Sequence, residues 1–523
     1  MKLPLTPAWR ARILAVVAGV GAGLAHPPLG LIIGIVAYGL LMWLDTIDDP
    51  RPLRAAFFRG WLAGLGYFGL GTWWIGEAFL VDAANQGWMA PIALLAMSGG
   101  LALFWGLAAL IYRLADVKGP WRVLVFAGAL ALCEWLRGHV LTGFPWNLPG
   151  EAWRAGSAPS QMASVVGAYG LSWITIALGA ATALLWTPGR TRLAAGAAIV
   201  AALAGLYGFG ALRLATAKAT AADAPMVRLV QANIDQKDKW KPENLDMVFS
   251  TYVGLTTQAS QVRPDIVIWP EGALPAVIDD LLAPGSPYVL RLTEALAPGQ
   301  TLMMGANRVG PGAKGGVDYF NSLVVLRREA PGLRVTGFYD KHRLVPFGEF
   351  LPLGDLATRL GIRSLVHMPE DFTAGPPPRP IHPQGVPALQ PLICYEALFP
   401  GFASAAAKRG GQRAQWLLNV SNDAWFGASS GPWQHLNIAA YRAIEEGLPI
   451  ARATPTGVST MIDAYGGPIL GARLTLGEQG IIDVRLPPAL ARTVYSRFGD
   501  GGLAIMLLLS ASIAVAGRIR RAH

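Results

Sequence analysis

Cys394 stands where a thiol could act as a nucleophile. It follows the apolar run at residues 391–393 in a polar region of the chain, whereas Cys133, the other cysteine, lies in a distant apolar segment. Two cysteines so placed exclude a disulfide framework. A free thiol has a pKa of roughly 8.5 and reacts at neutral pH only when a neighbour lowers that pKa or removes the proton. Whether Cys394 is reactive or a buried structural thiol therefore depends on its neighbours.

Two further ionisable residues follow runs that are typical of strands. Residues 267–269 lead to Glu271, and residues 338–340 lead to Lys341. Proteins commonly place an acid, a base and a nucleophile at the ends of different strands, which gathers groups that are remote in sequence. Taken singly, Glu271 could be a strand cap and Lys341 a solvated charge, so the set carries more information than either member.

Together and in this order, Glu271, Lys341 and Cys394 resemble the catalytic triad of the nitrilase, or carbon–nitrogen hydrolase, superfamily. The resemblance implies that Glu271 is the general base. It implies that Lys341 places a positive charge beside the developing oxyanion, helped by a backbone N–H just after Cys394. His342 and His435 stay open as alternative bases. The seven histidines are scattered and form no Cys/His cluster, so we expect neither a metal nor another cofactor.

The elements that must carry these residues include a membrane part. Hydrophobic residues make up 53% of the 523 residues and charged residues 15%, and the mean hydropathy is +0.39. A bilayer span takes about 20 apolar residues. A cleaved signal peptide is an alternative for the first apolar segment, because Lys2, Arg10 and Arg12 precede it. Eight segments are long enough or nearly so: 11–27, 30–46, 57–80, 90–115, 121–140, 167–187, 192–214 and 501–518.

Basic residues in the connecting loops set the expected topology. Lys or Arg residues precede the first segment and follow the second, fourth, sixth and eighth, whereas the loops at residues 26–30 and 82–90 contain none. Positive loops stay in the cytoplasm, so we expect both termini inside and the loop after the seventh segment in the periplasm of a bacterial inner membrane. That loop, residues 216–500, holds 26 Lys or Arg and 25 Asp or Glu, so it carries little of the chain's net charge of +10. We therefore expect no nucleic-acid partner.

These segments divide the chain into residues 1–215 with seven helices, an external domain at 216–500, and residues 501–523 with an eighth helix and a cytoplasmic tail. In the external domain, helical stretches at 244–261 and 434–446 alternate with short β-branched runs, which predicts a layered α/β architecture with both sheet faces covered. The expected strands include residues 226–231, 265–269, 323–326, 392–394 and 416–420.

The outer loop at residues 137–167 carries Trp146 and Trp153. Tryptophans near a bilayer surface most often anchor a protein in the headgroup layer, so we expect that role for both rings, with contact between this loop and a lipid as the alternative.

Motifs along nearly the whole chain resemble the bacterial apolipoprotein N-acyltransferase family. They lie at residues 134–138, 143–146, 231–234, 269–271, 319–322, 341–352, 394–396 and 422–427. The resemblance implies an α-β-β-α nitrilase sandwich held outside the membrane by eight spans. It assigns the triad to Glu271, Lys341 and Cys394, and it marks further positions as important for activity: Glu349, Tyr395, Glu396, Trp240 and Asn321.

The separate roles of these further positions stay open. Glu349 would support Lys341 or share the base role, and Glu396 would orient the pocket. Trp240 is either a lid or core aromatic or a direct substrate contact. The loop at 422–427 presents Trp425 and Phe426, which suit contact with an acyl chain.

The resemblance implies ping-pong acyl transfer by a monomer without cofactors. Cys394 would accept an acyl group from a phospholipid, expected to be phosphatidylethanolamine. It would pass that group to the α-amine of a diacylglyceryl-cysteine at the N-terminus of a lipoprotein. One alternative is a membrane-tethered amidase that uses the same triad but ends with water. Another is a transporter or lipoprotein-handling scaffold, with Glu77, Cys133 and Glu134 as its candidate residues.

Overall fold

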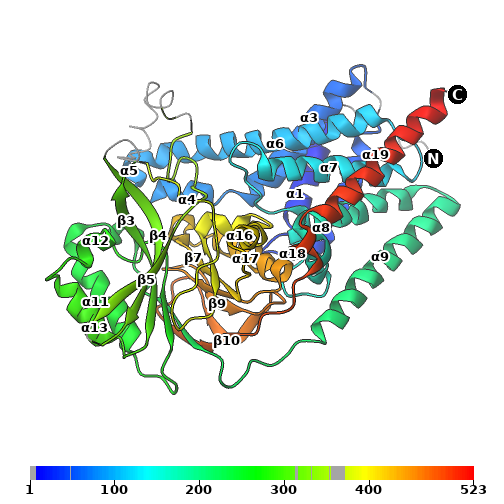
Figure 1. The fold of residues 1–523 in the computed structure, drawn as a ribbon. Coiled ribbons are helices and arrows are strands. Elements are labelled where there is room, and N and C mark those ends of the chain that lie inside the picture. Colours follow the sequence, from blue (N-terminus) through cyan, green and yellow to red (C-terminus); the bar gives the residue numbers. More distant parts are fainter. Residues whose placement is uncertain are drawn as a thin grey trace.

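The computed structural model describes residues 8–47, 49–312, 316–330, 332–352, 354 and 371–522. Long helices lie side by side at one end of the molecule, and two sheets with their own helices lie at the other (Figure 1). The last helix, α19, returns from the sheets to the helical part, which therefore contains both ends of the described chain.

Each of the eight predicted apolar segments contains a helix. The helices are α1 (Ala8–Gly23), α2 (Ala37–Leu44), α3 (Pro52–Gly71), α6 (Ala90–Ala115), α7 (Arg122–His139), α8 (Ala163–Ala181), α9 (Arg190–Leu214) and α19 (Gly501–Ala522). Among the described residues, four helical stretches are long and apolar enough to cross a membrane by themselves: Ala83–Ala115, Pro159–Trp186, Arg190–Leu214 and Gly501–Ile519.

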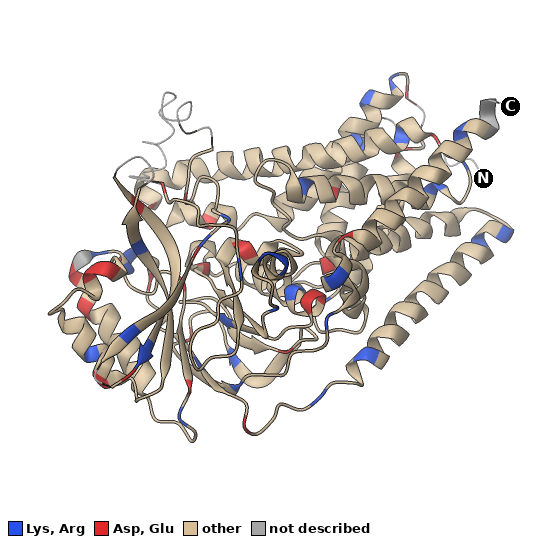
Figure 2. Cartoon of the chain, viewed as in Figure 1, with Lys and Arg blue, Asp and Glu red and all other residues tan. Residues whose placement is uncertain are grey.

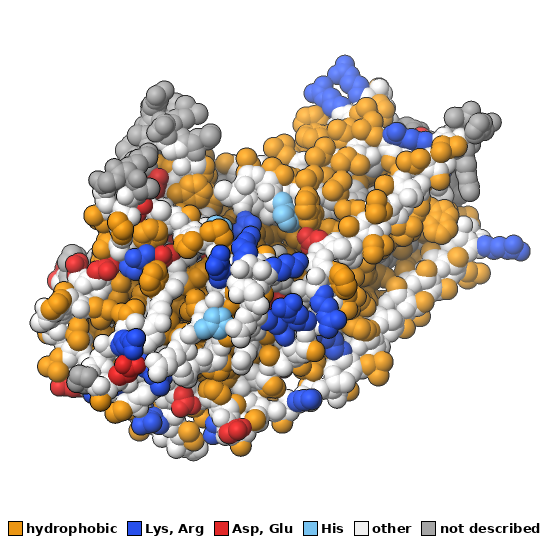
Figure 3. Space-filling view, in the orientation of Figure 1, with side chains coloured by type: hydrophobic (Ala, Val, Ile, Leu, Met, Phe, Trp, Pro, Cys, Tyr) orange, Lys and Arg blue, Asp and Glu red, His pale blue; other side chains and the backbone are white. Residues whose placement is uncertain are grey.

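Small residues let the helices of this part approach closely. A Cβ on Gly19 of α1 would lie 1.8 Å from the backbone oxygen of Ala63 in α3, and one on Gly60 would lie 2.5 Å from that of Trp105 in α6. Such contacts are typical of helices that associate within lipid. The outer helices instead expose large apolar side chains: Leu193 and Leu212 on α9 are each 75% exposed (Figure 3). This surface requires apolar surroundings and indicates a membrane protein.

The other end of the molecule contains two mixed sheets. The first has the order β11-β1-β2-β3-β4-β5, formed by Gly480–Arg485, Met226–Gln231, Ile266–Trp269, Thr301–Pro311, Val317–Arg328 and Leu333–Asp340. The second has the order β10-β9-β8-β7-β6, formed by Pro468–Leu474, Ser459–Ile462, Ile450–Ala453, Trp416–Val420 and Leu389–Ile393. Every expected strand is present, but β6 ends at Ile393, so Cys394 begins the next element rather than ending the strand.

Four layers bury the faces of both sheets. Apolar side chains from the two sheets pack together, with Ile268 and Leu323 from the first meeting Ile393 and Leu418 from the second. The outer face of the first sheet is covered by α11 (Leu245–Thr257) and α13 (Pro287–Ala295). The outer face of the second is covered by α16 (Phe402–Gly410) and α17 (Gly431–Glu446). The arrangement is the α-β-β-α sandwich that the resemblance implied.

One face of α17 joins the sandwich to the helical part. Gln434 accepts a hydrogen bond from Trp146 Nε1 (2.8 Å), and Tyr441 donates to the backbone oxygen of Trp153 (2.6 Å). Glu445 accepts one from the Ala168 N–H (2.8 Å). Both tryptophans are therefore buried between the two parts, and the expectation that they anchor in the headgroup layer is wrong. Burial in protein and burial in lipid favour the same residue type, so sequence alone cannot separate them.

This interface makes stability depend on pH. Burial raises the pKa of Glu445 to about 8 and that of Glu151 to about 7, although Arg442 pairs with both carboxylates and opposes the shift. A carboxyl whose pKa is higher in the folded state stabilises the fold below its unfolded pKa, and that contribution is lost as the pH rises through the folded value. We expect the melting temperature of the purified protein to fall between pH 5 and pH 8, and Glu445→Gln to reduce this slope.

Differential scanning fluorimetry across this pH range measures the effect. The matched control is Glu294→Gln on α13, because Glu294 is exposed. An unchanged slope in Glu445→Gln would show that the buried carboxyl does not titrate in this range.

Candidate active site

The three candidate residues follow three strands that end at one side of the sandwich. Glu271 comes after β2, Lys341 after β5, and Cys394 after β6 as the first residue of the 3-10 turn Cys394–Leu398. Lys341 Nζ donates a hydrogen bond to Glu271 Oε1 (3.1 Å), and both side chains are buried. The charges of both act on the partly exposed Cys394. The structure therefore brings together the groups that the sequence motifs nominated.

A second carboxylate shares the Lys341 ammonium. Lys341 Nζ donates to Glu349 Oε1 (2.8 Å), and Asn321 Nδ2 donates to both Glu271 Oε1 and Glu349 Oε1 (2.7 Å each). Two donors thus hold two like-charged groups close together. Burial lowers the pKa of Lys341, but the two carboxylates outweigh that effect and hold the pKa above its ordinary value. Lys341 is therefore a fixed cation.

The backbone around Glu271 leaves no room for a side chain on the neighbouring strand. A Cβ on Gly305 of β3 would lie 2.4 Å from Glu271 Cα and 2.6 Å from the Pro270 oxygen. Real Cβ atoms do not approach backbone atoms so closely, so glycine is required for this contact. The Asn422 N–H fixes the other side of the carboxylate by donating to Glu271 Oε2 (2.7 Å).

Cys394 occupies a strained turn. Its φ of 47° lies in the left-handed region, where a non-glycine residue costs of order 1–3 kcal/mol. Glu396 secures the turn, because its Oε2 accepts the Ile393 N–H (2.9 Å) while its Oε1 accepts Tyr339 OH and the His342 N–H (2.8 Å each). Glu396 therefore ties the backbone before Cys394 to the backbone beside Lys341. Burial raises the pKa of Glu396 to about 7, although these hydrogen bonds lower it in part.

A buried polar network lies behind the turn. His435 Nε2 lies 3.3 Å from the backbone oxygen of Cys394, and His435 Nδ1 lies 3.0 Å from Asp423 Oδ1. Arg452 Nη2 donates to Asp423 Oδ2 (2.5 Å). Both ring nitrogens of His435 therefore face the support of the turn. His342 Nδ1 lies 2.8 Å from the Gly375 oxygen, so among the described residues the hydrogen bonds of both rings go to groups other than the thiol.

The electrostatics decide how the thiol can react. Burial raises the pKa of Cys394, the Glu271 and Asp423 charges raise it further, and Lys341 and Ser421 lower it only in part. The resting thiol is therefore protonated, and it needs a base at the moment of attack. Glu271 is the carboxylate whose charge acts on the thiol most strongly, which makes it the candidate for that base.

Sequence reasoning missed two buried residues before Trp240. Lys239 and Gln236 lie in the short helix α10 (Gln236–Lys239), and both side chains are buried. Burial lowers the pKa of Lys239 to about 8, while the Glu271 charge raises it in part. The sequence Lys237-Asp238-Lys239-Trp240-Lys241 is typical of a solvated charge run, and only the three-residue spacing from Gln236 to Lys239 could have suggested a shared inner face.

The remaining aromatic candidates are placed differently from one another. Tyr395 donates to the backbone oxygen of Gly143, which ties the turn to the loop after α7. Phe426 packs against Trp74, with ring centroids 4.4 Å apart, at the boundary with the helical part. Trp425 is 40% exposed and Trp240 is 42% exposed, so both rings are available to a ligand.

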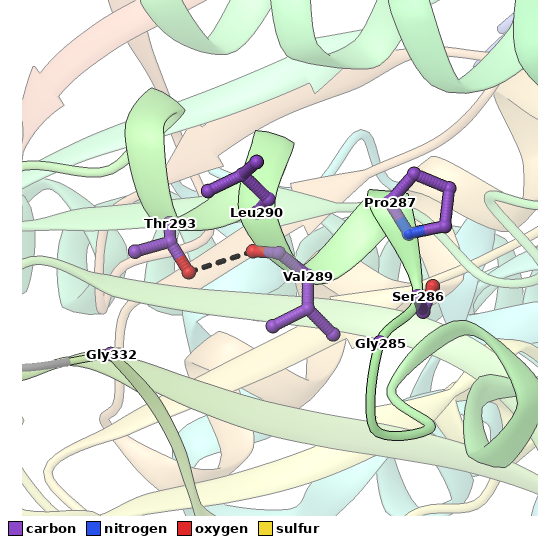
Figure 4. A pocket seen from close by; sticks show the side chains of 7 residues that line it. All are labelled: Gly285, Ser286, Pro287, Val289, Leu290, Thr293 and Gly332. Carbon is purple, nitrogen blue, oxygen red and sulfur yellow. Dashed lines mark hydrogen bonds between the residues drawn. The ribbon is translucent and has the colours of Figure 1, made fainter.

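A cavity lies at the boundary between the sandwich and the helical part. Its volume is about 440 Å³, and its lining includes Glu77 from the helical part, Gln236 from α10, and Ala424 and Gly427 from the loop that carries Trp425. Another cavity of about 440 Å³ lies beside α13 (Figure 4), and none of the residues that line it is ionisable: Gly285, Ser286, Pro287, Val289, Leu290, Thr293 and Gly332. In the described part of the chain, no three His, Cys, Asp or Glu side chains group as metal ligands.

Comparison with known proteins accounts for both parts of the chain. Residues 18–181 match the apolipoprotein N-acyltransferase N-terminal domain, and residues 226–495 match the carbon-nitrogen hydrolase family. The apolipoprotein N-acyltransferase of Caulobacter vibrioides is 53% identical over 98% of this chain and 95% of its own. Those of Brucella melitensis (39%, covering 93% and 91%) and Bradyrhizobium diazoefficiens (38%, covering 99% and 97%) are similar over comparable lengths.

The close approach at Gly305 gives a stability prediction. Gly305→Ala forces the backbones of β3 and the Glu271 segment apart, so we expect a loss of about 1–3 kcal/mol in the free energy of unfolding. The matched control is Gly337→Ala in β5 of the same sheet, where a Cβ would meet nothing within 4 Å. Denaturant unfolding of both variants measures the difference. Equal stabilities would show that the contact at Gly305 is not as tight as described.

Proposed function

Because the chain belongs to the apolipoprotein N-acyltransferase family, we propose that it carries a fatty acyl group on Cys394, from a membrane phospholipid to the α-amine of a lipoprotein N-terminus. The chain is a membrane acyltransferase. One observation carries the finer proposal: the charges of Glu271 and Lys341, a buried and hydrogen-bonded pair, both act on the Cys394 thiol. That set supplies a nucleophile, a base and an oxyanion partner.

In the first half-reaction, Glu271 removes the Cys394 proton as sulfur attacks the ester carbonyl of the phospholipid. The tetrahedral intermediate carries its negative charge beside Lys341 and the N–H that follows Cys394. The intermediate collapses by breaking the carbon–oxygen bond, and the leaving lysophospholipid alkoxide takes the proton from Glu271. The products are a Cys394 thioester and a lysophospholipid.

In the second half-reaction, the neutral α-amine of the diacylglyceryl-cysteine attacks the thioester. Glu271 takes the amine proton, and the second tetrahedral intermediate uses the same oxyanion partners. Breaking the carbon–sulfur bond releases the amide, and the departing sulfur regains the proton from Glu271. Water would compete with the amine at this stage, so the site must exclude it.

Glu349 supports Lys341 in this scheme. Glu271 appears among the charges that act on Cys394, whereas Glu349 acts on Lys341. Glu349 Oε2 also accepts the Val345 N–H (2.8 Å), which holds the loop after Lys341 in place. We therefore assign the proton transfers to Glu271 and the orientation of the ammonium to Glu349.

The proposed donor is a membrane lipid and the proposed acceptor is anchored in the membrane by its diacylglyceryl group. Both facts suit a catalytic domain that is attached to transmembrane helices. We propose that all eight helical segments cross the inner membrane, with the sandwich in the periplasm and both termini in the cytoplasm. Lys and Arg side chains gather at the helix ends that lie away from the sheets (Figure 2), as the positive-inside rule requires for this orientation. We further propose phosphatidylethanolamine as donor, Trp425 and Trp240 as lipid contacts, and a monomer as the active form.

The amidase alternative uses the same triad but needs only an anchor. The family match extends through residues 18–181 and relatives align over nearly the whole chain, so the helical part belongs to the same function as the sandwich. Transfer of the acyl group to an amine is therefore better supported than its hydrolysis by water.

The nucleophile is tested with Cys394→Ala and Cys394→Ser. Purified protein is incubated with phosphatidylethanolamine, and intact-protein mass spectrometry detects the acyl adduct. We expect the adduct on the wild type and none on Cys394→Ala, because the thioester has lost its sulfur. Addition of a diacylated lipopeptide should yield triacylated peptide. An adduct of equal yield on Cys394→Ala would overturn the assignment, and free fatty acid without triacylated peptide would favour the amidase.

The two carboxylates are separated by Glu271→Gln and Glu349→Gln. Loss of a general base lowers the rate of acyl-enzyme formation by about 10²–10⁴-fold, which we expect for Glu271→Gln. Loss of one charge-assisted hydrogen bond costs about 10- to 100-fold, which we expect for Glu349→Gln. Single-turnover kinetics measure both variants. A larger loss in Glu349→Gln would reverse the two roles.

A further inference from the structure

Lys239 carries a buried ammonium that the mechanism above does not use. The side chain is 1% exposed, and its Nζ atom has no hydrogen-bond partner in the part of the chain that the structure describes. Glu271 acts on it electrostatically without pairing with it. A buried, unpaired ammonium is strongly unfavourable, and proteins retain one chiefly where it has a function.

Other buried polar atoms without a partner belong to the same helix or to a residue that binds Glu271. Gln236 lies on the same face of α10, and neither its amide nitrogen nor its amide oxygen has a partner among the described residues. The same holds for Oδ1 of Asn422, whose N–H binds Glu271. A Cβ on Gly272 would lie 3.7 Å from Lys239 Nζ, so this glycine places the backbone next to Glu271 close to the ammonium. Trp240 flanks it, with the ring centroid 5.3 Å from Nζ.

We propose that Lys239 and Gln236 form a subsite for the phosphodiester of the acyl-donor phospholipid. The proposal rests on the function proposed above and adds where the polar part of the donor is held. Lysine is a common phosphate ligand, and a glutamine amide adds an N–H donor. The phosphodiester lies a few bonds from the scissile ester, so an anion site next to Glu271 places that ester near the base.

The acceptor fits this subsite poorly. Its α-amine is neutral or cationic, and a cation would be repelled by the Lys239 ammonium. A simpler role, in which Lys239 only offsets the charges of Glu271 and Glu349, would leave the amide of Gln236 unexplained. It would also affect every acyl donor alike, which separates the two roles by experiment.

The test compares two donors with the same acyl chain, phosphatidylethanolamine and an uncharged p-nitrophenyl ester. Single-turnover acylation of Cys394 is measured in the full-length wild type, Lys239→Met and the matched control Lys241→Met, whose lysine is exposed and pairs with Asp238. We expect the phospholipid-to-ester rate ratio to fall about 10- to 100-fold in Lys239→Met, the value of a lost charge-assisted hydrogen bond. The ratio should stay at the wild-type value in Lys241→Met.

Three results would overturn the subsite. They are an equal loss with both donors, no loss with either, or a loss confined to transfer onto a diacylated lipopeptide. If Lys239→Met does not fold, Gln236→Leu decides, with a ratio reduced by about 3- to 10-fold expected and an unchanged ratio contradicting the proposal. A wild type that forms no acyl-enzyme from phospholipid would refute the proposed function instead, so the two failures are distinguishable.

Discussion

A single ammonium group organises this protein. Lys341 Nζ binds both Glu271 and Glu349 and so holds two buried carboxylates close to each other. For this contact, the residues that follow β2 and β5 must lie close enough for their side chains to form hydrogen bonds. Gly305 permits the backbone approach, and Asn321 donates to both carboxylates from β4. One buried charge therefore connects residues that follow two strands of the first sheet, β2 and β5.

Buried polar contacts also attach the sandwich to the helical part. Along α17, one face supports the second sheet, while Gln434 binds Trp146 in the loop after α7 and Glu445 binds the Ala168 N–H in α8. His435, on the same helix, faces the backbone oxygen of Cys394. Helix α17 thus connects the Cys394 backbone to the helical part, and this connection fixes the position of the thiol relative to those helices.

The parts of the site that follow strands could be predicted from sequence, because an apolar run that stops at Glu271, Lys341 or Cys394 shows both the element and its chemical end. Lys239 could not be predicted, because its neighbours are charged and its burial depends on packing against a distant strand end. The burial of Trp146 inside the protein is hidden from sequence for a related reason. Hydropathy measures a preference for leaving water, and protein and lipid satisfy that preference equally well.

The first and last strands of the sandwich are neighbours. Met226 in β1 pairs with Arg485 in β11, and β1 is otherwise bordered by β2. During synthesis, β1 emerges first but stays without this partner until almost the entire domain has been made. Its polar edge must be shielded through that interval, because an unpaired strand edge promotes aggregation. Completion of the sheet therefore waits for β11, and a chain that stalls before residue 480 would leave one edge of β1 open.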